Sequence, residues 1–386
     1  MIGLFKRVFN AAAVLLLNVV VMIAAAEWGA KAVLKMARDA RPAYMPTYTD
    51  AEYSKLYDTD DAAKYREISA EGWRMGDTIY SPFVEYRMTP YQGRHFTITE
   101  QGFRPNDLAP QDLARPGRKV FVFGGSTTMG SGVANSETIP AAVERALQAA
   151  GLTDVQVFNF GVVSYFSTQE RIALERLLTA GIKPDVAVFI DGLNDFYYCT
   201  IPDQSSWNER LVQLTSARSR QPLMLEIANR SNVVQLARHL GGDKSVMVRE
   251  WGSFCQSDAD VAGVVQRLDT NRRILDGMAE RLGFELIFVQ QPVPTYHYDN
   301  AKRVVPVTDE MLGYHANARR GYPMMAAMRD MGSLWTRNLL WLAELEPASA
   351  NAYVDMVHYS PAFNDIIGRA IADEIVKRGI KERQKP

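Results

Sequence analysis

Four short apolar runs divide the chain, and each of them ends at glycine or at polar residues. Runs of this length, rich in Val, Ile and Phe and bounded by turn residues, are typical of strands that are buried on both faces. They are Val120–Phe123, Val155–Phe160, Asp185–Ile190 and Phe284–Val289.

Longer stretches, in which apolar residues recur every three or four positions, separate these runs. The clearest is Asp258–Leu282, and similar patterns predict helices at about Ile139–Ala150, Thr168–Ala180 and, more weakly, Leu223–Ala228 and Val233–Leu240. Strands that alternate with helices imply a parallel sheet covered by helices on both faces.

The amino terminus carries a separate apolar segment, Val8–Ala26, with Lys6 and Arg7 before it. A membrane-spanning helix needs about 20 apolar residues, so the segment is just long enough. A cleaved signal peptide is the alternative, because Ala24–Ala26 would suit a cleavage site. The helical pattern continues unbroken through Met36, which favours an uncleaved signal-anchor.

The basic residues around this segment do not settle which way it faces. The four basic residues that follow the segment do not favour transfer of the downstream chain across the membrane. Long downstream domains, however, are translocated largely regardless of charge. We expect a single-pass protein of a bacterial inner membrane with its main domain in the periplasm. The basic residues are Lys31, Lys35, Arg38 and Arg41.

Composition excludes several classes of function. The 386-residue chain has a net charge of −1, so no long-range field would recruit nucleic acid. Its two cysteines, Cys199 and Cys255, could form a disulfide or remain free thiols, and neither has a His or a second Cys at ligand spacing. We expect no metal and no other cofactor.

The first candidate for chemistry is Ser126, which follows the strand Val120–Phe123 and the glycines Gly124 and Gly125. Ligands of open α/β sheets bind at the carboxyl ends of strands, and glycines there let the backbone approach them closely. Ser126 is therefore placed as a nucleophile would be. A plain strand-to-helix turn would explain the glycines as well, whereas a phosphate-binding loop would need a Lys that is missing.

A serine nucleophile needs a base, which is usually a histidine oriented by a carboxylate. Asp355 stands three residues before His358, so one turn could bring its carboxylate to the imidazole; a capped helix start would explain this spacing nearly as well. The remaining histidines have no such partner in the sequence. They are His95, His239, His297 and His315.

Acyl transfer also needs hydrogen-bond donors for the oxyanion that develops on the carbonyl. Three are available just beyond predicted strands: the backbone N–H groups of Ser126 and Gly161 and the side-chain amide of Asn194. Gly161 and Asn194 could each be ordinary turn residues. Their shared position at the carboxyl ends of successive strands favours one common site.

These residues resemble the sequence blocks of the SGNH/GDSL-type hydrolases, in the family's order. The anchored bacterial branch of that family also has a Glu near the end of its span, as at Glu27, a Gly-Phe-Arg turn, as at Gly102–Arg104, and a Gln-Pro pair, as at Gln291–Pro292. The blocks are Phe123-Gly-Gly-Ser-Thr-Thr128, Asn159-Phe-Gly161, Gly192-Leu-Asn-Asp195 and Asp355-Met-Val-His358.

The resemblance implies a three-layer α/β/α, flavodoxin-like domain. It assigns Ser126 as nucleophile, His358 as base, Asp355 as the orienting carboxylate, and Gly161 and Asn194 as oxyanion donors beside the Ser126 N–H. The sequence departs from the family at two positions. Gly125 stands where the Gly-Asp-Ser-Leu motif that names the family (the name motif) has Asp, and Phe363 stands where Gly is common.

We expect an anchor at residues 1–39, a juxtamembrane linker and extension at 40–101, and the hydrolase domain at 102–386 with a helical insertion at 196–283. The expected activity is hydrolysis of O-acyl, above all acetyl, esters of a carbohydrate or a lipid-like substrate. The alternatives are acyl transfer beside a membrane acyltransferase of polysaccharide assembly, and a non-catalytic subunit of a membrane assembly.

Overall fold

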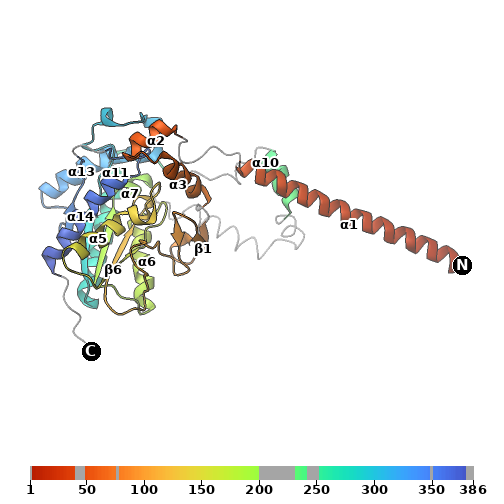
Figure 1. The fold of residues 1–386 in the computed structure, drawn as a ribbon, viewed down its shortest axis with the longest axis horizontal. Coiled ribbons are helices and arrows are strands. Elements are labelled where there is room, and N and C mark those ends of the chain that lie inside the picture. Colours follow the sequence, from red (N-terminus) through yellow and green to blue (C-terminus); the bar gives the residue numbers. More distant parts are fainter. Residues whose placement is uncertain are drawn as a thin grey trace. The chain divides into compact units, whose positions relative to one another are not determined.

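The computed structural model describes residues 2–39, 48–74, 78–199, 231–240, 252–347 and 351–379. They belong to two compact units (Figure 1). The first unit comprises residues 1–43 and 202–251, and the second comprises residues 44–201 and 252–386.

Helix α1 (Ile2–Asp39) dominates the described part of the first unit. Its segment Phe9–Leu34 has a mean hydropathy of 2.3 and a length sufficient to cross a membrane, a test that a signal sequence would also pass. The short helix α10 (Asn232–Leu240) lies beside it. Glu27 of α1 accepts hydrogen bonds at the start of α10 from the hydroxyl of Ser231 and from the backbone N–H of Asn232, the latter at 2.7 Å.

A five-stranded parallel sheet forms the centre of the second unit, with the strand order β6-β5-β7-β8-β9. This is the flavodoxin-like order, in which the second strand is added on one side of the first and all later strands are added on the other side. The expected α/β class is confirmed. The strands are β5 (Arg118–Gly124), β6 (Val155–Asn159), β7 (Val186–Asp191), β8 (Glu285–Gln290) and β9 (Leu339–Trp341).

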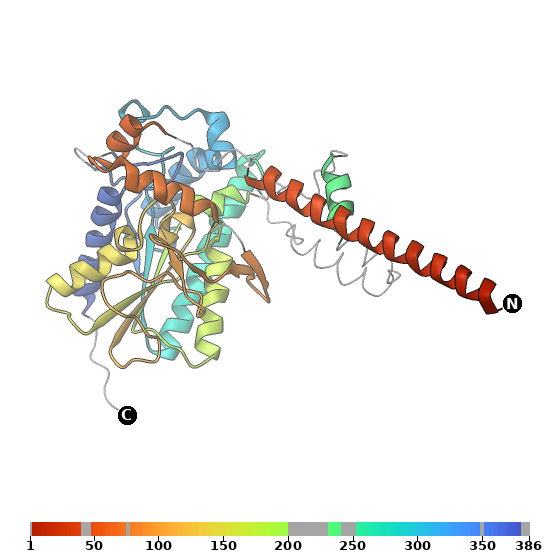
Figure 2. The same cartoon turned by 45° about the vertical axis from the view of Figure 1, so that its right-hand side comes forward.

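The two faces of the sheet carry different side chains because successive residues of a strand point in opposite directions. In β5, Val120 and Val122 join one hydrophobic cluster, and Phe121 and Phe123 join the other. Helices α5 and α14 cover the valine face, and α6 and α11 cover the phenylalanine face (Figure 2). These helices are α5 (Ile139–Ala149), α6 (Ser167–Thr179), α11 (Asp258–Leu282) and α14 (Pro361–Arg378).

The ends of these helices follow from local chemistry. Side-chain oxygens of Thr138, Ser257 and Ser360 accept backbone N–H groups of the first turns of α5, α11 and α14, which have no acceptor inside the helix. Gly283 ends α11 with a φ of +72°, a conformation that glycine adopts without strain.

The extension before the sheet contains two helices, α2 (Asp50–Tyr57) and α3 (Ala62–Arg74), which the sequence pattern did not predict. A capping box of Thr49 and Glu52 begins α2, a signal that was readable in the sequence. Two small hairpins follow the helices. They are β1 (Thr78–Ser81) with β2 (Glu85–Met88), and β3 (Tyr91–Gln92) with β4 (Thr97–Ile98).

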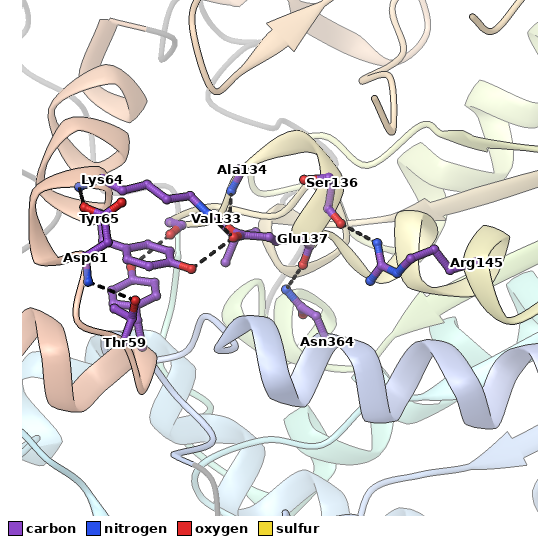
Figure 3. Close-up of polar contacts among 12 residues, drawn as sticks. Thr59, Asp61, Lys64, Tyr65, Val133, Ala134, Ser136, Glu137, Arg145 and Asn364 are labelled. Carbon is purple, nitrogen blue, oxygen red and sulfur yellow. Dashed lines mark hydrogen bonds and ion pairs between the residues drawn. The ribbon is translucent and has the colours of Figure 1, made fainter. Parts of the chain in front are cut away.

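Glu137 attaches this extension to the sheet domain (Figure 3). It lies in the 3₁₀ turn η1 (Asn135–Glu137), and its carboxylate accepts hydrogen bonds from Lys64 and, at 3.0 Å, from the hydroxyl of Tyr65, both on α3. Its carbonyl accepts a bond of 2.9 Å from the Asn364 side chain of α14. One residue therefore joins α3, the segment before α5, and the last helix.

The later part of the chain contains elements that the sequence pattern did not predict. Strand β9 is one of them, the polar excursion after β8 (residues 295–332) is largely helical, and an isolated bridge joins Tyr353 to Tyr359. The predicted helix at Leu223–Ala228 lies outside the described residues. The excursion contains η3 (Asn300–Lys302), α12 (Asp309–Leu312), η4 (Gly313–Asn317) and α13 (Ala318–Asp330).

Candidate active site

Ser126 begins the four-residue helix α4 (Ser126–Met129) directly after β5. Its backbone N–H is the first of the helix and therefore has no acceptor inside it. The side chain is partly exposed, although the three residues after it are buried. Ser126 thus lies at the carboxyl edge of the sheet with part of its surface accessible.

His358 lies against Ser126 and connects it to Asp355. The Nε2 atom of His358 is 2.8 Å from the Ser126 hydroxyl, and its Nδ1 is 2.6 Å from Oδ2 of Asp355. His358 and Asp355 are 5% and 7% exposed. A buried carboxylate therefore orients the imidazole, and the other ring nitrogen can accept the serine proton.

Asp355 remains a carboxylate in this buried position because donors surround it. Burial alone would raise its pKa, but the charge of His358 and hydrogen bonds to His358 and to backbone N–H groups lower the pKa below its usual value. The N–H groups of Val357 and His358 donate to Oδ1 at 2.9 and 2.8 Å. The Oδ2 atom is left to bind the imidazole.

The loop that carries these two residues is closed on itself by backbone hydrogen bonds. Val354 N–H donates to the His358 carbonyl, and Ser360 N–H donates to the Ala352 carbonyl, each at 2.9 Å. The hydroxyl of Tyr359 donates to the Pro292 carbonyl beyond β8 at 2.6 Å. These bonds hold the loop at the same edge of the sheet as Ser126.

Asn194 comes from α7 (Leu193–Tyr197), which directly follows β7. One N–H of its side-chain amide donates to the Tyr165 carbonyl at 2.7 Å. An amide nitrogen has two N–H groups, so a second remains for an oxyanion. The bond to Tyr165 also fixes the direction of the amide.

Gly161 has only its backbone N–H to offer, and that group donates to Oδ1 of Asn159 at 2.9 Å. An oxyanion could receive this donor only by sharing it with Asn159 or by displacing it. Gly161 is glycine for a steric reason, since a Cβ there would lie 2.3 Å from the backbone nitrogen of Met129.

The departure from the name motif at Gly125 also has a steric explanation. A Cβ at this position would lie 2.2 Å from Nδ2 of Asn194. Glycine therefore lets the Asn194 amide approach the backbone beside Ser126. The other departure, Phe363, is 1% exposed and packs against the rings of Tyr353 and Tyr359.

Two residues that support the serine were not predicted in this role. Arg104 is fully buried and donates to the carbonyls of Met129, Gly130 and Val133 at 2.8, 2.7 and 2.7 Å, and its burial lowers its pKa to about 9. Asn159 donates to the Thr128 carbonyl at 3.0 Å. Together they hold the segment that follows the serine. Both residues stand in motifs that the sequence showed, Arg104 in the Gly-Phe-Arg turn and Asn159 in the Asn-Phe-Gly block. Neither motif indicates which groups these side chains contact.

The remaining histidines and the cysteines have different positions. His95 lies 3.2 Å from the carboxylate of Glu67 on α3, and His297 is exposed. Cys199 and Cys255 form a disulfide, which decides between the two alternatives for them. In the part of the chain that the structure describes, no group of three or more His, Cys, Asp or Glu residues could hold a metal ion.

Comparison with known proteins gives matches among solved structures only. No protein-family model matches the chain, and no curated protein does. The matched structures include several described as esterases, acylhydrolases or lipolytic proteins of the G-D-S-L family.

Three of these structures illustrate the likeness. The carbohydrate acetylesterase Est24 from Sinorhizobium meliloti is 14% identical, with a TM-score of 0.33, and the match covers 68% of this chain and 100% of that one. The esterase EstA from Pseudoalteromonas sp. is 12% identical, with a TM-score of 0.36 over 68% and 98% of the two chains. A G-D-S-L family lipolytic protein from Veillonella parvula is 11% identical, with a TM-score of 0.37 over 68% and 100%.

Proposed function

We propose that the protein is an SGNH-type serine hydrolase that cleaves carboxylic esters through an acyl-serine intermediate. The observation that carries this proposal is the continuous hydrogen-bonded series Ser126–His358–Asp355, with distances of 2.8 and 2.6 Å. A serine, an imidazole and a buried carboxylate in this order are the groups that acyl transfer requires.

In the proposed reaction, the Ser126 oxygen attacks the acyl carbonyl while its proton passes to Nε2 of His358. Asp355 stabilises the imidazolium that results. The Ser126 N–H and the free N–H of Asn194 bind the oxyanion, with Gly161 as a third donor if its bond to Asn159 opens. The alcohol leaves with the proton from His358, and a water molecule then repeats the sequence to release the acid and the free serine.

The proposed substrates are O-acyl esters, above all acetyl esters, of a carbohydrate or of a lipid-like molecule at a membrane. The apolar segment of α1 supports attachment to a membrane, which we propose is the inner membrane, with the catalytic domain on its periplasmic side. The disulfide between Cys199 and Cys255 supports an oxidising compartment outside the cytoplasm.

The proposal is tested with a fluorophosphonate, which forms a stable bond only with an activated serine. Full-length protein in detergent should gain the mass of one adduct, and the Ser126→Ala and His358→Ala variants should gain none. The folding of each variant is checked by circular dichroism. A folded wild-type protein that gains no adduct, and hydrolyses no acetyl ester, would contradict the proposal.

Two alternatives use the same fold. In the first, the acyl-serine passes its acyl group to or from a cell-surface polysaccharide beside a membrane acyltransferase, so water must be excluded from the intermediate. Product analysis with a sugar acceptor separates transfer from hydrolysis.

In the second alternative, the protein is a non-catalytic assembly subunit. The oriented triad argues against this alternative, because binding requires no base beside a serine.

A further inference from the structure

A short segment outside the triad lies between two parts of the proposed site. The turn η4 is attached to α7 because Nδ2 of Asn317 donates to the Phe196 carbonyl at 2.8 Å, two residues beyond Asn194. Ala316 of the same turn packs against a large hydrophobic cluster that also includes Val357 of the Asp355–His358 loop. Residues of η4 therefore lie beside the helix that carries the oxyanion donor, and they pack against the same hydrophobic cluster as the loop that carries the base.

His315 belongs to this turn and has an unusual environment. Its ring centroid is 4.7 Å from that of Tyr197, which lies on α7 one turn after Asn194. Its Nδ1 is buried and has no hydrogen-bond partner among the described residues. Buried polar atoms are nearly always paired, so an unpaired one beside a reaction site indicates a place for a ligand atom.

The charge state of His315 agrees with a binding role. Burial and then the nearby charge of His358 lower the pKa of His315 to about 3, and Asp355 acts weakly in the other direction. The imidazole is therefore neutral in the pH range in which esterases work. A neutral imidazole has one N–H donor and one nitrogen acceptor, as a hydroxyl group is also both donor and acceptor.

We propose that His315 binds a hydroxyl group on the alcohol portion of the substrate ester. This inference rests on the proposed function, because His358 must deliver its proton to the leaving oxygen and the alcohol must therefore lie beside His358. A second hydroxyl of that alcohol would then come within reach of His315. The substrate class is accordingly an ester of a polyhydroxylated alcohol, either a sugar or glycerol.

The experiment compares esters that differ in these hydroxyl groups. The full-length protein is assayed with 1-acetylglycerol, with acetylated xylobiose and with propyl acetate, which lacks the additional hydroxyls. His315→Phe retains a planar ring and removes both nitrogens. We expect kcat/KM for at least one hydroxylated ester to fall about tenfold more than for propyl acetate, as the loss of one buried hydrogen bond predicts.

The matched control is His297→Phe, a change of an exposed histidine that should leave all three values unchanged. A selective loss with acetylated xylobiose would identify a sugar ester, and a selective loss with 1-acetylglycerol would identify a glycerol ester. An equal change with all three esters would mean that the ring serves only packing, and would overturn the inference.

Binding separates this inference from the proposed function. Ser126→Ala cannot form the acyl-enzyme, so calorimetry can measure its affinity for the two hydroxylated esters. Adding His315→Phe should weaken that affinity about tenfold, even if the wild-type protein hydrolyses none of the esters. Equal affinities in the two backgrounds, or no binding of either ester, would overturn the role of His315, whereas hydrolysis of propyl acetate would still support the proposed function.

Discussion

Nη1 of Arg303 donates a hydrogen bond of 2.9 Å to the carbonyl of Asp355, from a loop more than fifty residues earlier in the chain. Its Nη2 donates to the Met356 carbonyl at 3.0 Å, and its guanidinium lies 4.8 Å from the ring centroid of Tyr353. The planar side chain thus binds two successive carbonyls of the loop that orients His358.

Replacement of Arg303 by Lys keeps the positive charge but should still impair the site. An ammonium group cannot reproduce the two-pronged contact or the planar stacking. We expect kcat to fall about tenfold, with a smaller change in KM, because a displaced base costs rate more than binding. Steady-state kinetics on a simple acetyl ester measure both.

A matched control for Arg303 is Arg319→Lys, which changes an exposed arginine paired with Asp309. Surface ion pairs contribute little, so this variant should keep its activity and stability. If Arg303→Lys were as active as Arg319→Lys, the two hydrogen bonds to the loop would have no part in orienting His358.

The second prediction concerns Gly125. Gly125→Asp would restore the residue of the name motif. Its Cβ, however, would lie 2.2 Å from Nδ2 of the Asn194 amide, which is too close. The amide would have to move, and the loss of one oxyanion donor typically costs 10²- to 10³-fold in rate. We expect the rate of fluorophosphonate labelling to fall about 100-fold, as in Asn194→Ala.

Two further variants test this explanation. The double variant Gly125→Asp/Asn194→Ala should be little worse than either single one, because both remove the same donor. Gly263→Ala, in α11 with no atom within 4 Å of the new methyl group, should label at the wild-type rate. Wild-type labelling by Gly125→Asp would show that the site accommodates the side chain without moving Asn194.

The third prediction is a fall in stability with rising pH, caused by buried carboxyl groups behind the site. Asp191, which ends β7, is 3% exposed, and Glu170 on α6 is 1% exposed. Burial and the charge of Asp195 raise the pKa of Asp191 from 3.8 to about 7, and burial and Asp191 raise the pKa of Glu170 well above its usual value.

The direction of this change in stability follows from proton binding. The folded protein holds protons here that the unfolded chain has already released, so stability declines as pH rises from about 4 towards 7 and beyond. Asp191→Asn cannot ionise and should be more stable than the wild type at pH 8, by roughly 2 to 4 kcal/mol. Urea unfolding at pH 5 and pH 8 measures the difference. A wild-type protein equally stable at both pH values would contradict the prediction.

The fourth prediction concerns the disulfide between Cys199 and Cys255, which are 56 residues apart. Closure of a loop of that length restricts the unfolded chain and stabilises the fold by about 4 kcal/mol in the chain-entropy model. The double variant Cys199→Ser/Cys255→Ser should therefore unfold at a lower temperature than the wild type. Addition of a reductant should lower the melting temperature of the wild type but not that of the variant; equal melting temperatures without reductant would contradict the prediction.

The strands that position the site were predictable because they are buried on both faces. Such strands are continuous apolar runs, and β5, β7 and β8 lie within a residue or two of the predicted bounds. The edge strand β9 was missed, since it has only three residues, all of them half-buried. The helices α2 and α3 were missed because their buried faces are rich in tyrosine, which resembles a polar linker.

The supporting residues of the site could not be predicted for a different reason. Arg104, Arg303 and His315 contact residues that are distant in the sequence, and most of these partners are backbone carbonyls or aromatic rings. Such contacts leave no spacing pattern, because a carbonyl is present at every position. The pairing of Cys199 with Cys255 is likewise a matter of distance in space.

The amino-acid sequence by itself determined the alternation of strands and helices, the apolar segment at the amino terminus, and the residue types Ser126, Asn194, Asp355 and His358 at the ends of elements. These features depend on local pattern and on residue chemistry. Only the tertiary structure decided that Ser126 lies 2.8 Å from His358, that Arg303 binds the carbonyl of Asp355, and that the ring of His315 lies against Tyr197. Distances between residues far apart in the chain are set by how the whole sheet and its helices pack, and no local pattern encodes them.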